Sequence, residues 1–212
     1  MGTKITFPRV DGKEATGYLA KVGKAGAPGV VVIQEWWGLQ DQIKGICDRL
    51  MLAGYDALAP DLYAGTVVPY HDTEAAGREM NSLNFAECTD QVVRGAVLYL
   101  GKAGAKVGLT GFCMGGAVAI LGAARIAEIS AAVAFYGLPP ESLVKPADVK
   151  VPLQGHFADR DDTITPPMVD SFEAGLEAAK QNAEFFRYDA DHGFLNEQRD
   201  VHDRKAADIA WQ

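Results

Sequence analysis

The sequence predicts a three-layer α/β sandwich built around a mostly parallel sheet. Short, almost continuously apolar runs alternate with longer segments in which apolar residues recur at helical spacing. Glycine and proline fall mostly between these segments, where turns are expected. Repeated strand–helix–strand units of this kind place parallel strands side by side and cover both faces of the sheet with helices.

The predicted strands are apolar runs bounded by turn residues. They are expected at residues 29–33, 56–60, 106–110, 131–136, 151–157 and 183–188. An antiparallel hairpin over residues 4–20 is expected to precede them, because its first part alternates like an edge strand. Ligand sites in parallel α/β sheets lie at the carboxyl ends of the strands. The residues that follow each run are therefore the candidates for chemistry.

The predicted helices lie between these strands. They are expected at residues 41–53, 84–101, 114–127, 166–181 and 201–212. In the first, Ile43, Ile46 and Leu50 share one face, which predicts packing on the sheet. The last helix reaches Gln212 without a glycine or asparagine cap, so we attach no functional expectation to it.

Composition bounds the possible functions. The chain has 212 residues, of which 48% are hydrophobic and 23% charged, with no repeat or long linker, so we expect one domain over residues 1–212. Lys and Arg number 20 and Asp and Glu 28, a net charge of −8, and no basic cluster is present. These features argue against a nucleic-acid partner.

Targeting and metal-binding patterns are also weak. The longest uncharged stretch, residues 107–124, is interrupted by five glycines, and the amino end lacks the pattern of a signal peptide. We therefore expect no membrane partner and a cytoplasmic location. The three cysteines are scattered without CxxC spacing, which predicts neither a disulfide framework nor a metal site. Of these, Cys47 and Cys88 are interpreted as structural.

The strongest chemical signal is Gly111-Phe112-Cys113-Met114-Gly115-Gly116, between a buried strand and an Ala-rich helix. This is the pattern of a nucleophile elbow with cysteine as nucleophile, in which small residues on either side let neighbouring backbone approach. The helix amino terminus would favour a thiolate and offer the Met114 N–H to an oxyanion. The alternative is a small buried cysteine in a glycine-rich turn.

Two later loops could complete a catalytic triad. His192 lies in a loop after the strand-like residues 183–188, and Asp159, Asp161 and Asp162 lie in an acidic turn after residues 151–157. One acid could hold the imidazole in its working tautomer, and His192 could move the proton. Spacing alone does not separate Asp161 from Asp162, and Asp159 could equally be a turn residue.

The end of the first buried strand, Gln34-Glu35-Trp36-Trp37-Gly38, is a further candidate. Trp36 is placed to supply a second oxyanion N–H. Packing is the alternative for both tryptophans. Glu35 ends an apolar strand, and a carboxylate there is costly to bury without a partner.

Taken together these motifs resemble the dienelactone hydrolase family, whose fold is the α/β-hydrolase sandwich. The motifs that carry the resemblance are Gln34-Glu35-Trp36-Trp37-Gly38, Ala59-Pro60-Asp61-Leu62-Tyr63, the cysteine elbow, Phe135-Tyr136-Gly137 and Asp191-His192-Gly193-Phe194. The resemblance implies a carboxylic-ester hydrolase that cleaves a small-molecule ester or enol-lactone through a thioester acyl-enzyme. It implies no metal and no organic cofactor, and we expect a monomer or weak homodimer.

The resemblance also implies residue roles. Cys113 is similar to the nucleophile, His192 to the general base and acid, and Asp161 to the orienting acid, since Ala158-Asp159-Arg160-Asp161 is similar to the family's pattern. Glu35 would interact with the resting nucleophile.

The residues expected to bind substrate are Trp37, Tyr136 and Arg78. The family's arginine shortly after the histidine is missing, so Arg199 and Arg78 are the candidates for a substrate carboxylate. One alternative is a broader esterase, acting on thioesters or activated phosphate esters with the same triad. Another is a binding protein on the same scaffold.

Overall fold

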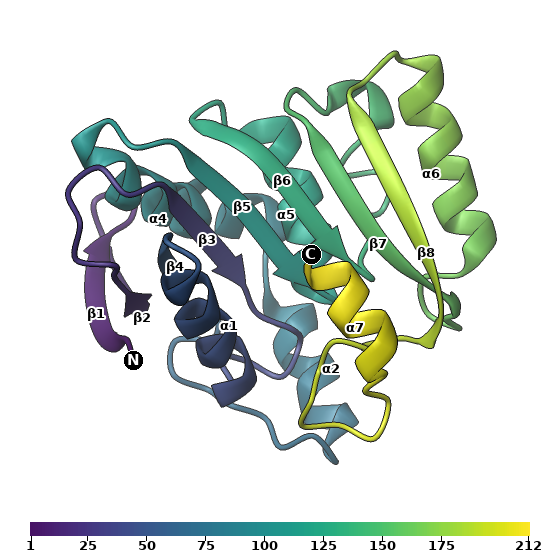
Figure 1. Cartoon of the computed structure of the whole chain (residues 1–212), viewed down its shortest axis with the longest axis horizontal. Coiled ribbons are helices and arrows are strands. Elements are labelled where there is room, and N and C mark those ends of the chain that lie inside the picture. The colour runs from purple at the N-terminus through teal and green to yellow at the C-terminus, as the bar shows by residue number, and fades with distance from the viewer.

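The computed structural model describes residues 1–212, apart from the side chain of Ala103, and contains one eight-stranded sheet (Figure 1). The strand order is β1-β2-β4-β3-β5-β6-β7-β8. The first two pairings, β1 with β2 and β2 with β4, are antiparallel and the other five are parallel, which confirms the predicted sheet and hairpin. The strands are β1 (Thr3–Pro8), β2 (Glu14–Ala20), β3 (Gly29–Ile33), β4 (Asp56–Pro60), β5 (Val107–Phe112), β6 (Ile129–Phe135), β7 (Leu153–Arg160) and β8 (Ala183–Asp191).

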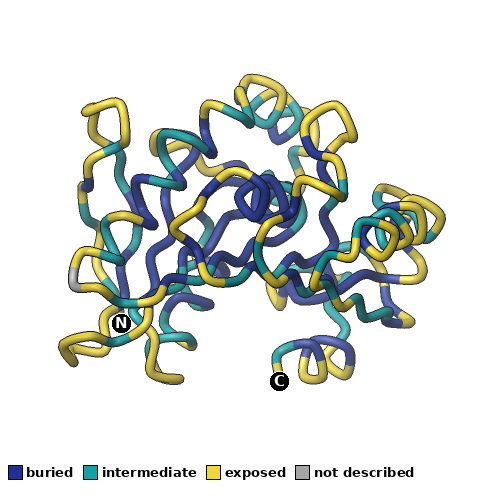
Figure 2. Tube along the Cα trace, turned by 90° about the horizontal axis from the view of Figure 1, so that it is seen from above, coloured by how far each residue is buried: buried dark blue, intermediate teal, exposed yellow. Residues whose placement is uncertain are grey.

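Helices cover both faces of the sheet, as the three-layer prediction requires (Figures 1 and 2). The α-helices are α1 (Asp41–Leu52), α2 (Thr73–Ser82), α3 (Phe85–Cys88), α4 (Arg94–Leu100), α5 (Met114–Arg125), α6 (Pro166–Ala178) and α7 (Arg204–Trp211). A π-helical turn, η1 (Thr89–Val93), joins α3 to α4, and two short 3₁₀ turns are η2 (Gly101–Ala103) and η3 (Pro146–Asp148).

Two apolar clusters hold the layers together. One lies between the sheet and α4, α5 and α6, where Val97, Val118 and Phe172 are buried. The other lies between the opposite face and α1 and α7, where Ile43 and Ala207 are buried. Strands β3, β5 and β6 are covered on both sides, which is why they are nearly continuous in apolar residues.

Helix α2 departs from the sequence prediction, which placed no helix there. Its sequence is polar, contains Gly77 and buries only Ala76, so it has too few large apolar residues to mark a helix in the sequence. The helix begins at Asp72, whose side chain accepts a hydrogen bond from the Ala75 N–H at 2.9 Å. The helix predicted at 84–101 is instead divided into α3, η1 and α4.

The last helix is shorter than predicted. Helix α7 begins at Arg204 rather than residue 201, because the Asp203 side chain caps it by accepting from the Ala206 N–H. Among the described residues, no helix is both long enough and apolar enough to cross a membrane.

The parallel strands bring the candidate residues to one edge of the sheet. Glu35 lies just beyond β3, Cys113 directly after β5, Tyr136 after β6, Asp161 after β7 and His192 after β8. These positions are 157 residues apart in sequence at the extremes. Parallel pairing places all five at the carboxyl edge of the sheet.

Candidate active site

Cys113 occupies a strained turn between β5 and α5. Its backbone has φ 55° and ψ −119°, a conformation that non-glycine residues rarely adopt. The turn is held by the Cys113 N–H, which donates to the Phe135 carbonyl at 3.0 Å, and by the Cys113 carbonyl, which accepts from the Gly116 N–H at 2.9 Å. The strain is thus fixed by contacts with β6 and α5.

Two glycines give this turn the space that it needs. A Cβ atom at Gly115 would lie 2.5 Å from the carbonyl oxygens of both Ile33 and Gln34. A Cβ atom at Gly111 would overlap the Gly115 carbonyl. The start of α5 therefore packs directly on the end of β3, which brings Cys113 close to the segment that carries Glu35.

His192 is held by Asp161 through a short hydrogen bond. The distance from His192 Nδ1 to Asp161 Oδ2 is 2.7 Å. The other oxygen of Asp161 accepts from the Thr163 and Ile164 N–H groups, each at 2.8 Å. Asp161 is buried, whereas Asp162 is exposed and makes no contact of this kind among the described residues. The geometry therefore separates two acids that spacing could not.

The surroundings of His192 raise its pKa. Burial lowers the pKa of His192, but its hydrogen bond to Asp161 and the electrostatic influence of the nearby Cys113 and Asp161 side chains outweigh this effect and raise the pKa to about 10. A histidine with this pKa carries a proton at neutral pH. The arrangement thus supports an imidazolium beside the Cys113 sulfur.

Glu35 is buried and is satisfied by neutral donors. The Tyr136 hydroxyl donates to Oε1 at 3.0 Å, and the Asn196 side-chain amide donates to Oε2 at 2.8 Å. Burial raises the pKa of Glu35, although both hydrogen bonds oppose this shift. Within the described residues Glu35 makes no hydrogen bond to Cys113, so the expected contact with the resting nucleophile is not formed here.

Asn196 is a site residue that sequence reasoning missed. It is fully buried and lies four residues after His192, in the stretch where the family resemblance leads one to expect an arginine. The signal available in the sequence was an asparagine in the stretch where an arginine is expected. Its amide supplies a hydrogen bond to Glu35 but no positive charge.

The two predicted oxyanion donors lie at the ends of their elements. Met114 is the first residue of α5, so its N–H is among those that a helix leaves without an internal acceptor. Trp36 follows Glu35 beyond β3, and its N–H has no backbone acceptor among the described residues. Both positions agree with an oxyanion site near the Cys113 sulfur.

Two cavities meet at Cys113 and His192. The first, of about 270 Å³, is lined almost entirely by apolar side chains and also contains Tyr136. The second, of about 440 Å³, is lined by Trp36, Val201 and several charged side chains. Met80, from the unpredicted helix α2, and Thr163 line both. Cys113 is thus accessible from an apolar cavity and from a polar cavity, whose polarity comes from its charged side chains.

The structure contradicts two of the predicted substrate-binding residues. Trp37 is 1% exposed and packs edge-on against Trp36 and Tyr70, because its large ring fills the space beneath α2. Arg78 is exposed on α2 and pairs with Glu74 one turn away. Neither lines the two cavities at Cys113. By contrast, Arg199 lines the polar cavity, with its guanidinium 5.4 Å from the centre of the Trp37 ring.

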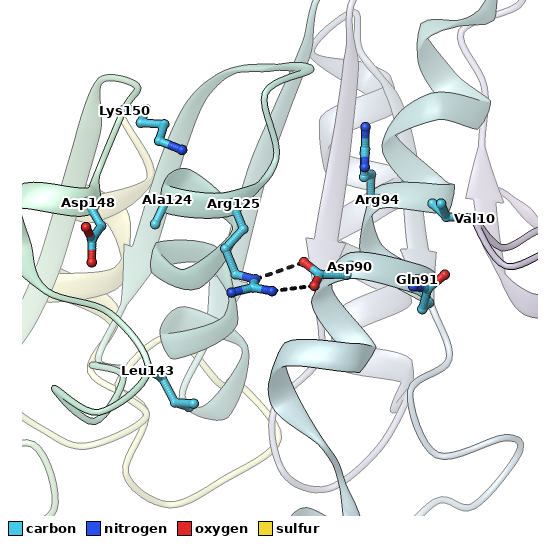
Figure 3. Close-up of a pocket in the computed structure, with 9 residues that line it drawn as sticks. All are labelled: Val10, Asp90, Gln91, Arg94, Ala124, Arg125, Leu143, Asp148 and Lys150. Carbon is cyan, nitrogen blue, oxygen red and sulfur yellow. Dashed lines mark hydrogen bonds and ion pairs between the residues drawn. The ribbon is translucent and has the colours of Figure 1, made fainter.

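A third cavity, of about 570 Å³, lies at the far end of α5 from Cys113 (Figure 3). The charges lining it include Asp90 and Arg125, which form an ion pair with each other. None of the candidate catalytic residues reaches it. In the described part of the chain, no group of three or more His, Cys, Asp or Glu side chains is arranged to hold a metal ion.

The sequence model of the dienelactone hydrolase family matches residues 15–212. The chain belongs to the dienelactone hydrolase family. It is 34% identical to Protein usf of Aquifex pyrophilus, over 100% of this chain and 95% of that one. It is 33% identical, with the same coverage, to a protein of Aquifex aeolicus provisionally named carboxymethylenebutenolidase. The resemblance predicted from the motifs is confirmed, and the protein is a carboxylic-ester hydrolase that acts on esters or lactones.

Solved structures of dienelactone hydrolase type have the same fold. A provisionally named dienelactone hydrolase from Klebsiella pneumoniae superposes with a TM-score of 0.88 at 28% identity, covering 100% of this chain and 96% of that one. A dienelactone hydrolase-like promiscuous phosphotriesterase, P91, has a TM-score of 0.83 at 23% identity, covering 99% and 94%. The second likeness concerns the fold alone.

Proposed function

We propose that Cys113, His192 and Asp161 form a catalytic triad that hydrolyses carboxylic esters or enol-lactones through a thioester on Cys113. The observation that carries this proposal is that the acid, the histidine and the cysteine lie next to one another at the carboxyl edge of the sheet. Asp161 holds His192 Nδ1 at 2.7 Å, and His192 in turn interacts with a cysteine on a strained turn at a helix amino terminus.

The first half of the reaction forms the acyl-enzyme. The Cys113 sulfur, as thiolate, attacks the ester carbonyl carbon and forms a C–S bond. The carbonyl oxygen gains negative charge, which the N–H groups of Trp36 and Met114 would stabilise. The C–O bond to the alcohol or enol then breaks, and His192 gives its proton to the departing oxygen.

The second half releases the acid. His192, now neutral, takes a proton from a water molecule, and the resulting hydroxide attacks the thioester carbonyl. The C–S bond breaks, the carboxylic acid leaves, and the proton held by His192 remains beside the regenerated thiolate. Asp161 stabilises the imidazolium at both stages. No step needs a metal or redox cofactor.

Glu35 is a positioning residue in this scheme. Its carboxylate lies in a buried cluster with Tyr136 and Asn196, between the end of β3 and the loop that follows β8. We propose that this cluster fixes the Trp36 N–H, which follows Glu35 directly, relative to the His192 loop. The role rests on the hydrogen bonds and not on direct contact with the sulfur.

The proposal is tested by turnover of 4-nitrophenyl acetate combined with intact-mass detection of the acyl-enzyme. Wild type should form an adduct of one acetyl group, and Cys113→Ala should form none and lose activity by at least about 10³-fold. Cys88→Ala is the matched control, because Cys88 is a buried cysteine outside both cavities. It should keep the adduct. Full activity in a folded Cys113→Ala variant would overturn the proposal.

A further inference from the structure

The apolar cavity at Cys113 contains no lysine or arginine, and the one cation that lines it, His192, is already paired with Asp161 at 2.7 Å. Of the ionisable side chains, only Cys113, His192 and Tyr136 line it. The remaining walls are apolar or backbone, and their side chains include Met80, Phe85, Ala117, Leu121, Leu138 and Leu143. An anionic acyl group placed there would lose its water and would find no cation except the imidazolium that Asp161 already neutralises, which is unfavourable.

The arginines of the site lie on the other side of Cys113. Arg160 and Arg199 line the polar cavity together with Asp162 and Asp191. Arg160 is already paired with Asp191 at 2.9 Å and also with Asp189. Asn196, within the stretch where an arginine was expected, is a neutral donor that is used by Glu35. The two sides of Cys113 therefore differ in polarity and in charge.

An ester has an acyl group and a leaving group, and the order in which its bonds break indicates which cavity each of them occupies. The acyl group stays bound to Cys113 during the second half of the reaction, while the leaving group departs and a water molecule enters. That water must reach His192, which lines both cavities. A polar cavity suits the entry of water and an apolar one suits the retained acyl group.

We propose that the acyl group of the physiological substrate is an uncharged aliphatic chain that lies in the apolar cavity, while the leaving group occupies the polar cavity. This inference rests on the proposed function. It places the preferred substrate among neutral aliphatic esters rather than among compounds whose acyl part carries a carboxylate.

Chain length gives the first test, with 4-nitrophenyl acetate, butanoate and hexanoate as probes. Each buried methylene is worth about 0.8 kcal/mol, so kcat/KM should rise about fourfold per methylene until the cavity of about 270 Å³ is filled. The 4-nitrophenyl monoester of succinic acid, which is similar in length to the butanoate but anionic, should react at least about tenfold more slowly than the butanoate.

A variant in the wall of the apolar cavity tests whether this cavity causes the preference for longer acyl chains. Ala117→Leu adds bulk to the wall formed by α5, so the ratio of hexanoate to acetate kcat/KM should fall by about tenfold or more. Ala174→Leu makes the same change at an exposed position of α6 and should leave the ratio unchanged. The wild-type series stands on its own if Ala117→Leu does not fold.

The outcomes separate the two proposals. A kcat/KM that is flat or falls with chain length, or a succinate monoester that reacts faster than the butanoate, overturns the acyl assignment. In that case an acyl adduct on Cys113 still supports the triad. If none of the esters forms an adduct on Cys113, the triad proposal fails and the acyl assignment fails with it.

Discussion

At the residue scale, His192 lies between a buried carboxylate and a thiol, and these neighbours decide its charge. Asp161 is itself fixed by two backbone N–H groups, so it cannot turn away from the imidazole without losing them. The sulfur on the other side adds a second interaction that favours the protonated ring. The site thereby stores the proton that the leaving group needs.

The charge of His192 can be measured directly. We expect ¹⁵N NMR of the imidazole to give a pKa of about 10 in wild type, and a lower pKa in Cys113→Ala, because that variant removes one of the interactions that raise it. Cys47→Ala, which changes a buried cysteine of α1 far from the site in the fold, should leave the titration unchanged. A midpoint near 6.5 that does not respond to Cys113→Ala would refute the ion pair.

Asn196 provides a second test at this scale. Asn196→Ala removes one of the two donors to buried Glu35 and should lower the free energy of unfolding by about 1.5–3 kcal/mol at pH 7, measured by urea denaturation. Since burial already raises the pKa of Glu35, the loss should be smaller near pH 4, where more of the carboxyl is protonated, and should grow as pH rises.

The control for Asn196→Ala is the double variant with Glu35→Gln. A neutral glutamine has no charge to stabilise, so removing Asn196 should then have a smaller and pH-independent effect. Equal losses with and without the Glu35 carboxylate would show that Asn196 acts through packing alone.

At the element scale, the contact between the start of α5 and the end of β3 determines where Cys113 lies. Gly111 and Gly115 let the helix approach the strand backbone closely. Helix α5 is otherwise buried for most of its length, so it has little freedom to move as a body. A side chain at Gly115 must separate α5 from the end of β3, and a side chain at Gly111 must push the start of α5 away from β5.

Gly115→Ala tests this contact. The added Cβ would meet two carbonyl oxygens at 2.5 Å, so we expect a loss of about 1–3 kcal/mol in the free energy of unfolding, together with slower acylation of Cys113. Gly45→Ala is the matched control. Gly45 lies inside α1 with open space around it, so alanine there should stabilise the protein by about 0.5–1 kcal/mol. If Gly115→Ala changed neither the free energy of unfolding nor the rate of acylation, the backbone of the elbow would be able to shift and make room for the added Cβ.

At the scale of the whole molecule, two histidines on neighbouring strands respond to pH in opposite directions. His156 is buried in the sheet, stacked between Phe135 and Phe186 at centroid distances of 4.7 and 5.2 Å, and burial lowers its pKa to about 4. His192 lies at the end of β8 with its pKa raised to about 10. Both have an ordinary pKa of about 6.5 in the unfolded chain.

Linkage gives the sign of each effect. Between about pH 4 and 6.5 the unfolded chain binds the proton of His156 and the folded protein does not, so stability falls as pH falls through this range. Between about pH 6.5 and 10 the folded protein keeps the proton of His192 and the unfolded chain loses it, so stability falls as pH rises.

Urea denaturation between pH 4 and 10 tests both effects. His156→Gln should flatten the acid side of the stability curve, and His192→Gln should flatten the alkaline side, each leaving the other side as in wild type. Parallel shifts of the whole curve in both variants would show that the two histidines contribute through packing only.

The sequence by itself determined the order of strands and helices, the elbow at Cys113 and the family. These features depend on local physics: apolar periodicity, glycine at crowded turns, and motifs that occupy contiguous residues. Helix α2 escaped prediction because it is polar, buries only Ala76 and has a start that depends on the Asp72 cap.

Only the tertiary structure decided which distant side chains meet. It selected Asp161 over Asp162, joined Glu35 to Asn196 across 161 residues, and removed Trp37 and Arg78 from the cavities. It also divided the space around Cys113 into an apolar and a polar part. Burial, hydrogen-bond geometry and the direction of a side chain depend on neighbours brought together by parallel pairing, and spacing along one chain does not contain them.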